Sequence, residues 1–288
     1  MVFENPNPFF DFGIWPNIKR REDDVIIATY AKFGPLRMQQ IVAKILAKAG
    51  KVDVENIDSP WVELRSPNSA EKILEIDSLS GPRVLRTHLS APEVYQKTGK
   101  YIYVGRDPRD LIWNLYQFHL SANESWMSYF AAFGFTKAEP GLVFQDYWES
   151  WVDHNGAPFW SYFDRLKTWW TLKAEDNVLF LHYLDFKNDM VGVIQTFCEF
   201  LNLSFSQTEW ADLIKECDYS DITNASERET AFHNPFWNGG MTRTAKTLKV
   251  EPKSSWRDDL DSEHKTALIG QLDAWVGVAG RQWVLYGD

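Results

Sequence analysis

Short apolar runs alternate with longer amphipathic stretches along most of the chain. Four of these runs have the length of strands and are rich in branched and aromatic residues; they cover positions 25–29, 84–86, 101–104 and 178–182. Apolar residues at helical spacing predict helices over 37–49, 108–120, 144–152, 159–172, 190–201, 206–215 and 262–276. Nearly continuous apolar strands separated by helices are typical of a parallel sheet covered by helices on both faces. We therefore predict an α/β fold built around such a sheet.

The alternation runs without an internal repeat, a low-complexity tract or a Gly/Ser linker, so we predict a single domain over residues 1–288. With 288 residues, of which 44% are hydrophobic, the chain is long enough to bury a full core. The stretch from 221 to 255 has little hydrophobic pattern and contains Gly239-Gly240. Long unpatterned loops in compact domains are usually functional, so we interpret this stretch as a lid.

Three of the predicted strands lead into residues that can bind an anion or transfer a proton. The first strand leads into Lys32-Phe33-Gly34 and then a helix, so that backbone N–H groups, a helix N-terminus and a lysine converge. A lysine after a strand is weak evidence alone, because most such lysines are only solvated charges. The next two strands lead into His88 and Arg106. In parallel sheets ligands bind beyond the carboxyl ends of the strands, where all three residues fall.

The overall charge and the cysteines exclude several classes of protein. A net charge of −10 argues against nucleic-acid binding, so an anionic ligand needs a local group of cations. The candidate cations are Lys32, Arg37, Arg106, Arg109, Arg243, Lys246, Lys249 and Lys253, of which the last four alternatively form a solvated basic loop. No apolar run spans a membrane and no secretory signal is visible. Only Cys198 and Cys217 are present, so we expect reduced thiols and a cytoplasmic location.

The strand ends, taken together, resemble the cytosolic-type sulfotransferase family. Residues 29–37 read Thr-Tyr-Ala-Lys-Phe-Gly-Pro-Leu-Arg where the family has Thr-Tyr-Pro-Lys-Ser-Gly-Thr-Thr-Trp. Residues 86–89 match its Lys-Thr-His-Leu, and 103–110 match its Tyr-Val-x-Arg-Asn/Asp-x-x-Asp. A fourth match, over 177–189, is similar to its Val-Leu-x-x-x-Tyr-Glu-Asp-Met-Lys-x-Asp. Order and spacing agree over roughly residues 20 to 260, so the chain is identified as a divergent, bacterial-like member.

This resemblance implies an enzyme that takes a sulfuryl group from 3′-phosphoadenosine 5′-phosphosulfate (PAPS) and leaves adenosine 3′,5′-bisphosphate (PAP). It implies a P-loop-like strand-loop-helix site, a small-molecule acceptor and no metal. Lys32 corresponds to the family's catalytic lysine, which stabilises the leaving phosphate. His88 corresponds to its catalytic histidine, and a neutral imidazole suits a general base. A lone histidine after a strand is more often structural, but the Thr-His-Leu context favours the base.

The resemblance also implies a set of residues that bind the nucleotide. Arg106 suits the 3′-phosphate by a bidentate contact, and Asn114 stands where the family usually has a serine on that phosphate. Tyr183 matches a tyrosine near the adenine, although a core aromatic is nearly as good an interpretation. Arg109 is interpreted as a surface charge. The full implied set is Lys32, Phe33, Gly34, Pro35, Leu36, Arg37, Arg106, Asn114, Tyr183 and Lys249.

Two segments depart from the family pattern. Residues 33–37 lack two hydroxyl donors and an adenine-stacking tryptophan, and Pro35 removes a backbone N–H from the phosphate site. Arg37 either restores charge and stacks on the base or is exposed. The family's late Arg-Lys-Gly-x-x-Gly-x-Trp corresponds to 249–256 if Trp256 is its tryptophan, and both glycines are then absent. These departures make full affinity for the cofactor the open question.

The acceptor and the alternatives stay open at this point. Aromatic residues crowd positions 147–170; most are expected in the core, and a few lining a cleft predict a flat or apolar acceptor. Glu149, Asp153 and His154 nearby keep a cationic acceptor open. Phenols, alcohols and amines are not distinguished, nor is a monomer from a homodimer. The first alternative is a non-catalytic nucleotide-binding protein of the same fold; a P-loop phosphotransferase is disfavoured because Gly-x-x-x-x-Gly-Lys-Ser/Thr is absent.

Overall fold

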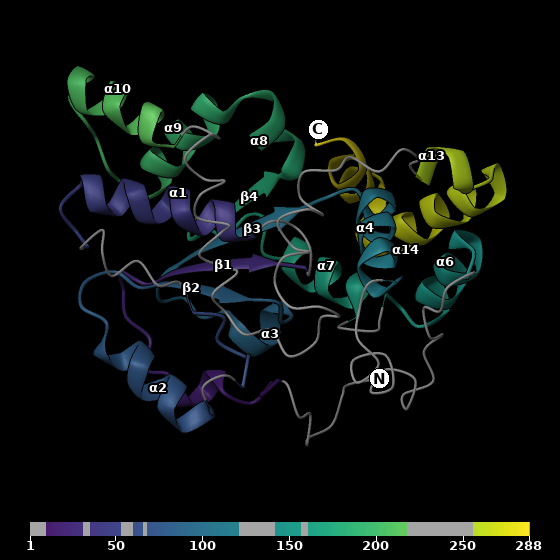
Figure 1. The fold of residues 1–288 in the computed structure, drawn as a ribbon, viewed down its shortest axis with the longest axis horizontal. Helices are drawn as coiled ribbons and strands as arrows, with labels where there is room; N and C mark the ends of the chain where they lie inside the picture. The colour runs from purple at the N-terminus through teal and green to yellow at the C-terminus, as the bar shows by residue number, and fades with distance from the viewer. Residues whose placement is uncertain are drawn as a thin grey trace. The chain divides into compact units, whose positions relative to one another are not determined.

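The computed structural model describes residues 10–30, 35–52, 60–65, 68–120, 142–156, 161–217 and 256–287, apart from the side chains at 35–37 and 118. Within these residues four parallel strands form one sheet in the order β2-β1-β3-β4 (Figure 1). The strands are β1 (Val25–Thr29), β2 (Val84–Thr87), β3 (Lys100–Gly105) and β4 (Val178–His182). The predicted α/β fold with a central parallel sheet is confirmed.

The sheet is parallel because each strand pair is joined by a long connection that contains helices. β1 is central, and all five of its side chains are buried. Val25 pairs with Val84 on one side and with Lys100 on the other, so the three strands start level with one another. Burial on both faces favours the branched and aromatic residues that the sequence places in these strands.

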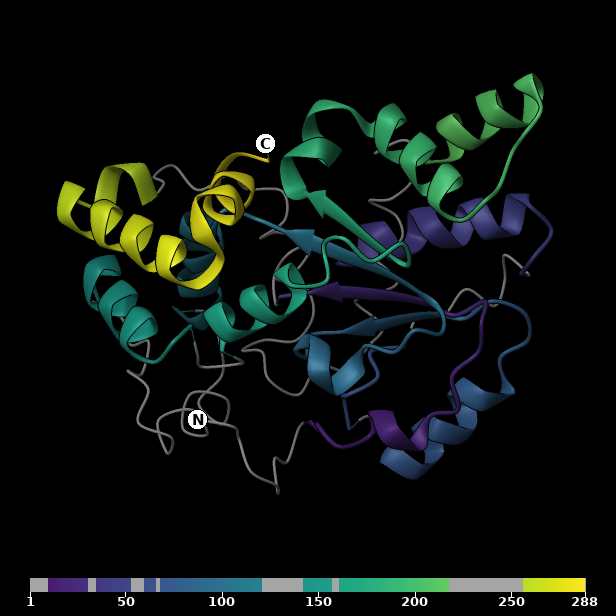
Figure 2. The ribbon, with the colours of Figure 1, turned by 180° about the vertical axis from the view of Figure 1, so that it is seen from behind.

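Helices of the first unit cover both faces of this sheet. They are α1 (Pro35–Lys48), α2 (Ser69–Ser78), α3 (Ala91–Val94), α8 (Tyr183–Asn188), α9 (Met190–Phe200) and α10 (Gln207–Glu216), with a 3-10 turn at Trp15–Asn17. Figures 1 and 2, which view the sheet from opposite sides, show α1 on one face and α7 (Tyr162–Trp170) on the other. On the α7 face the ring of Trp169 stacks on that of Tyr103, with 5.6 Å between centroids.

A second unit consists of helices packed through aromatic side chains. Among the described residues its helices are α4 (Pro108–Leu120), α6 (Phe144–Asp153), α13 (Trp256–Asp259) and α14 (Ser262–Tyr286). Trp113 packs edge-on against Phe144 at 4.8 Å, and Phe163 stacks on Trp275 at 6.1 Å. α14 changes direction at Gly277, whose φ of 71° and ψ of 175° are not helical. The predicted end of this helix, at 276, coincides with that kink.

Contacts between Cα atoms divide the chain into these two compact units. The first holds Met1–Gly105 and Arg165–Asp218, and the second holds Arg106–Asp164 and Tyr219–Tyr286. The single domain expected from the sequence therefore stays a prediction. The proposed lid at 221–255 lies outside the described residues. None of the described helices is both long enough and apolar enough to cross a membrane.

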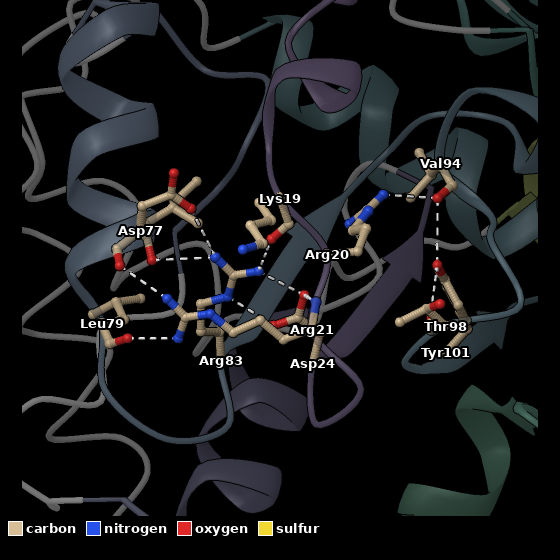
Figure 3. A network of polar contacts seen from close by, with 11 residues as sticks. Lys19, Arg20, Arg21, Asp24, Asp77, Leu79, Arg83, Val94, Thr98 and Tyr101 are labelled. Carbon is tan, nitrogen blue, oxygen red and sulfur yellow. Dashed lines mark hydrogen bonds and ion pairs between the residues drawn. The ribbon is translucent and has the colours of Figure 1, made fainter.

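The amino end of the sheet is closed by a buried ion pair (Figure 3). Arg83, immediately before β2, donates from Nε and Nη2 to the two carboxylate oxygens of Asp24, at 2.7 Å each. Its guanidinium also bonds Asp77 at 3.1 Å and the carbonyl oxygen of Lys19 at 2.7 Å. Because Asp24 precedes β1 and Asp77 belongs to α2, the arginine fixes a helix and two strand starts to one another.

Candidate active site at the carboxyl edge of the sheet

The carboxyl ends of the four strands lie along one edge of the sheet. Ala28 pairs with Thr87, Thr29 with Val104, and Gly105 with His182. Four predicted site residues follow these ends along the chain: Lys32 after β1, His88 after β2, Arg106 after β3 and Tyr183 after β4. The strand order reverses between β1 and β3, and ligands of open α/β sheets bind at such a switch point.

His88 is buried, and its orientation is fixed by the end of β1. Its Nδ1 atom lies 2.7 Å from the carbonyl oxygen of Thr29 and 3.2 Å from the hydroxyl oxygen of the same residue. A carbonyl oxygen only accepts hydrogen bonds, so Nδ1 carries the proton and donates it. The neutral ring therefore has its lone pair on Nε2, which is the atom that can take a proton from an acceptor.

The surroundings of His88 keep it neutral. Burial lowers its pKa from 6.5 to about 3, and the positive charges of Arg86 and Arg165 act in the same direction. The hydrogen bond with Thr29 acts in the opposite direction without cancelling them. Across the physiological range the imidazole is thus neutral rather than protonated.

Three residues near His88 were not singled out from the sequence. The ring of Trp61 meets the imidazole edge-on, with 4.8 Å between centroids. Arg165 is buried, and its guanidinium lies 6.0 Å from the centre of the Tyr30 ring. Burial lowers the pKa of Arg165 to about 10, which still leaves it charged at neutral pH. Glu63 is fully buried and accepts a hydrogen bond from the hydroxyl of Thr87, the residue before His88. The sequence signal that could have indicated this burial is the position of Glu63 between two apolar residues, Val62 and Leu64.

The phosphate loop is described only at its helical end. Lys32, Phe33 and Gly34 lie outside the described residues, as do the side chains of Leu36 and Arg37. α1 begins at Pro35, two residues before the predicted start. Proline suits the first helical position because its fixed φ matches a helix and no N–H is needed there. The implied phosphate contacts of this loop remain predictions.

Arg106 and Asn114 belong to the second unit. Arg106 is half-buried, and its carbonyl oxygen accepts a hydrogen bond from the Tyr162 hydroxyl at 3.4 Å. Asn114 donates its side-chain N–H to the carbonyl oxygen of Asp110, 2.6 Å away and one turn earlier in α4. One N–H of the amide is thus engaged with its own helix; because the amide has a second N–H, its implied role at the 3′-phosphate stays a prediction.

The interpretation of Arg109 as a surface charge is wrong. Its side chain is only 12% exposed and binds the carboxylate of Asp107 from Nε and Nη2, at 2.7 to 3.0 Å. The guanidinium also lies 4.5 Å from the centre of the Trp256 ring. Trp256 in turn donates its indole N–H to Asp110 at 2.7 Å. The sequence could not show this burial, because the tryptophan that covers Arg109 lies far along the chain.

The remaining predicted residues belong to segments other than the turn that carries His88. Tyr183 is the first residue of α8 and is half-buried rather than in the core, with Lys187 Nζ 5.9 Å from its ring centre. Lys249 lies outside the described residues. Glu149, one of the two carboxylates that kept a cationic acceptor open, bonds His264 Nε2 at 2.9 Å. Most aromatic residues of the crowded 147–170 stretch are buried, as predicted; they are Tyr147, Trp148, Trp151, Tyr162, Phe163 and Trp169.

Comparison with known proteins places the chain in a family. A model of the sulfotransferase domain matches residues 22–273. Human sulfotransferase 1C2 is 27% identical over 223 residues, which make up 72% of this chain and 69% of that protein. Mouse sulfotransferase SULT7A1, solved in complex with PAP, superposes with a TM-score of 0.67 at 18% identity, covering 96% of this chain and 92% of that one. Retinol dehydratase, solved with androsterone and inactive cofactor PAP, gives 0.63 at 19% identity, with coverage of 92% and 84%.

Since the family model covers most of the chain, this protein belongs to the sulfotransferase family. The predicted family and the predicted enzyme class are thereby confirmed. The solved structures agree in fold, with the parallel sheet and its flanking helices as the shared frame. Members of the family act on small-molecule acceptors. The roles of the individual residues stay predictions.

Proposed function

We propose that this sulfotransferase moves the sulfuryl group of PAPS to a hydroxyl or amine of a small molecule, with His88 as general base and Lys32 on the leaving phosphate. PAPS is the donor in this family, and PAP is what it becomes after transfer. One observation carries the assignment of the base. Nδ1 of His88 donates to the carbonyl oxygen of Thr29, which leaves Nε2 as a neutral, oriented proton acceptor at the ligand edge of the sheet.

The reaction needs three things from the protein. His88 Nε2 takes the proton of the acceptor while the acceptor oxygen or nitrogen bonds to sulfur. The bond between sulfur and the bridging phosphate oxygen breaks, and that oxygen keeps the electron pair. Lys32 and the backbone N–H groups of its loop then stabilise the added negative charge of the 5′-phosphate. The other residues bind and orient the nucleotide.

The low pKa of His88 makes the ring a weak base until the donor is bound. The nearby charges of Arg86 and Arg165 disfavour an imidazolium while the site holds no anion. A bound phosphosulfate brings negative charge to the same edge and raises the pKa of the ring, because an opposite charge favours the protonated form. Proton transfer thus becomes easier once the donor is bound.

Within the proposed function, an aromatic, uncharged acceptor fits better than a cationic one. The Trp61 and Tyr30 rings lie near His88 and Arg165, respectively, and aromatic side chains line pockets for flat molecules. The two arginine charges near His88 repel an ammonium group. The comparison of 4-ethylphenol with tyramine tests this, because the two phenols differ only by the ammonium. We expect a higher kcat/KM for 4-ethylphenol; a preference for tyramine would reverse the choice.

The remaining parts of the proposal concern location and assembly. We place the enzyme in the cytoplasm, in line with the family resemblance and with the burial of both cysteines, Cys198 and Cys217. A monomer and a homodimer remain equal alternatives, which light scattering of the purified chain distinguishes.

The nucleotide specificity is tested by comparing the thermal shift caused by PAP with that caused by ATP. PAP should stabilise the protein and ATP should not, since a ligand that binds only the folded state raises the melting temperature.

Activity decides between the enzyme and the non-catalytic alternative. Transfer from ³⁵S-labelled PAPS to a panel of phenols, alcohols and amines should yield a labelled product. PAP binding without any product across the panel would favour the non-catalytic protein. Stabilisation by ATP but not by PAP would favour a phosphotransferase instead.

A further inference from the structure

Glu63 is a fully buried carboxyl group close to the proposed base. Its Oε1 atom accepts hydrogen bonds from the hydroxyl of Thr87 and from the indole N–H of Trp15, the latter at 2.5 Å. Burial raises the pKa of this carboxyl above its ordinary value, although the bonds from Thr87 and Trp15 act in the opposite direction. A buried carboxyl is destabilising unless it is hydrogen-bonded, and these two bonds to Oε1 offset part of that cost without saying what the group does.

Thr87 passes the contact on to the turn that carries His88. Its hydroxyl donates to Glu63 and accepts from the backbone N–H of Leu89, 3.0 Å away. The residue before His88 and the residue after it are therefore tied to one hydroxyl group. Because a hydroxyl has a single proton, the carboxyl oxygen fixes its direction and leaves a lone pair for Leu89.

The segment that holds Glu63 reaches His88 by a second route. Val62 N donates to Arg86 O and Arg86 N donates to Pro60 O, both at 3.1 Å, so the segment runs parallel to β2. This pairing sets Trp61 against the imidazole, with 4.8 Å between the ring centroids. Residues 60–63 thus contact the turn at 87–89 through Glu63 and the imidazole of His88 through Trp61.

We propose that Glu63 is a positioning residue that keeps His88 in its reactive orientation through Thr87. The proposal rests on the role of His88 as the base. The bond from Nδ1 to Thr29 fixes one ring atom, but the ring also needs a fixed backbone for Nε2 to point at the acceptor. A misplacement of about 1 Å can lower a rate by about 100-fold. Glu63 acts by the place of its oxygen rather than by its charge.

The test removes the hydroxyl of Thr87 and leaves its shape. Thr87→Val should lower kcat by roughly 10- to 100-fold, with the KM for PAPS and the thermal shift by PAP nearly unchanged. Thr87→Ser keeps the hydroxyl and should restore most of kcat. Glu63→Gln keeps an accepting oxygen and should stay within about threefold of the wild type. Thr196→Val is the matched control, since its hydroxyl donates to the carbonyl oxygen of Gly192, one turn earlier in α9 and away from His88 along the chain.

A second arm shows whether the effect passes through His88. In a His88→Ala background, Thr87→Val should cause no further loss of kcat, because residues that act as a unit are not additive. An equal loss in both backgrounds, or a Thr87→Val enzyme with wild-type kcat, would overturn the proposal. Equal losses for Glu63→Gln and Thr87→Val would show that charge matters instead. If Thr87→Val does not fold, Thr87→Ala, which also removes the hydroxyl, replaces it in the same cycle.

The two proposals fail in different ways. If His88→Ala keeps wild-type activity, His88 is not the base and the proposed mechanism is wrong. If His88→Ala is inactive while Thr87→Val is normal, the base stands and only the role of Glu63 is wrong. Melting temperatures measured for every variant separate a loss of fold from a loss of rate.

Discussion

The two ends of β2 each carry a buried basic side chain, and the structure treats them in opposite ways. At the amino end Arg83 is fully buried and held by Asp24 and Asp77. Burial alone would lower the pKa of Arg83, but the bonds and charge of Asp24 raise it above its ordinary value. At the carboxyl end His88 is buried beside two further cations, and its pKa falls to about 3.

This difference separates stability from chemistry along a single strand. Arg83 is held in a hydrogen-bonded ion pair with Asp24, and such a group fixes elements in place without reacting. His88 loses its charge because its surroundings oppose it, so the ring retains a lone pair that can react. At both ends burial opposes the charged form; the carboxylates beside Arg83 outweigh this effect, whereas the cations beside His88 add to it.

The largest expected effect is on catalysis, from a substitution of His88 at the carboxyl end of β2. His88→Ala should lower kcat by about 10²- to 10⁴-fold, the usual contribution of a general base, and should leave PAP binding nearly unchanged. Steady-state kinetics on a productive acceptor and a thermal shift with PAP measure the two quantities. Retention of most activity at neutral pH would contradict the assignment.

Acid should also act on the carboxyl end. The pKa of His88 is about 3 in the folded state, against 6.5 ordinarily, so its contribution to stability is present above pH 6.5 and is lost as the pH falls toward 3. The difference amounts to at most about 5 kcal/mol. Urea unfolding from pH 7 to pH 4 measures it, and His88→Asn should flatten this part of the profile. Identical profiles for both proteins would show that His88 is not buried in solution.

The amino end should respond in stability alone. Arg83→Met leaves Asp24 buried without its partner and should lower the free energy of unfolding by about 3–5 kcal/mol. Urea unfolding gives the value, and the double variant with Asp24→Asn should recover part of it. The exposed pair of Lys97 and Glu175 is the control, and Lys97→Met should change little. A specific loss of kcat in a folded Arg83→Met enzyme would blur the contrast between the two ends.

Nucleotide binding extends the comparison to β3. Arg106→Ala should remove most of the thermal shift caused by PAP, a loss of about 1.5–3 kcal/mol for a charge-assisted contact. Lys173, an exposed cation next to the Trp170 ring, is the control. Arg109 is unsuitable because it is bonded to Asp107. Equal losses for Arg106→Ala and Lys173→Ala would show that the 3′-phosphate site is misplaced.

The smallest effect concerns the altered phosphate loop after β1. If Arg37 compensates for the missing hydroxyls and tryptophan, Arg37→Ala should weaken PAP binding by about 1–3 kcal/mol in a titration. Much tighter binding by the triple variant Pro35→Thr, Leu36→Thr, Arg37→Trp would show that the native loop is a weakened site. Tight native binding that Arg37→Ala leaves intact would mean that backbone N–H groups suffice.

The sequence predicted the sheet well because strands that are buried on both faces carry a local signal. β1 and β4 begin and end at the predicted residues, and so does α4. The helix after Ser262 was predicted to end at 276, but it continues beyond Gly277 to Tyr286. Local pattern marks the glycine and cannot show that the chain resumes its helix after the kink.

The surroundings of the predicted base were missed for a different reason. Trp61 and Glu63 reach His88 only because residues 60–62 pair with β2, and no periodicity in so short a segment predicts its partner. The burial of Arg109 likewise depends on Trp256 from a distant part of the chain. Residues that end strands were found from the sequence, whereas residues that support them needed the tertiary structure.

The pairing of residues 60–62 with β2 also bears on aggregation. β2 is an edge strand of the described sheet, and edge strands with open backbone groups can pair with another molecule. At Arg86 both the N–H and the carbonyl oxygen are already bonded, to Pro60 and Val62. A substitution that detached this segment would therefore uncover a template for intermolecular strand addition, and its first symptom would be insolubility at high concentration rather than slow turnover.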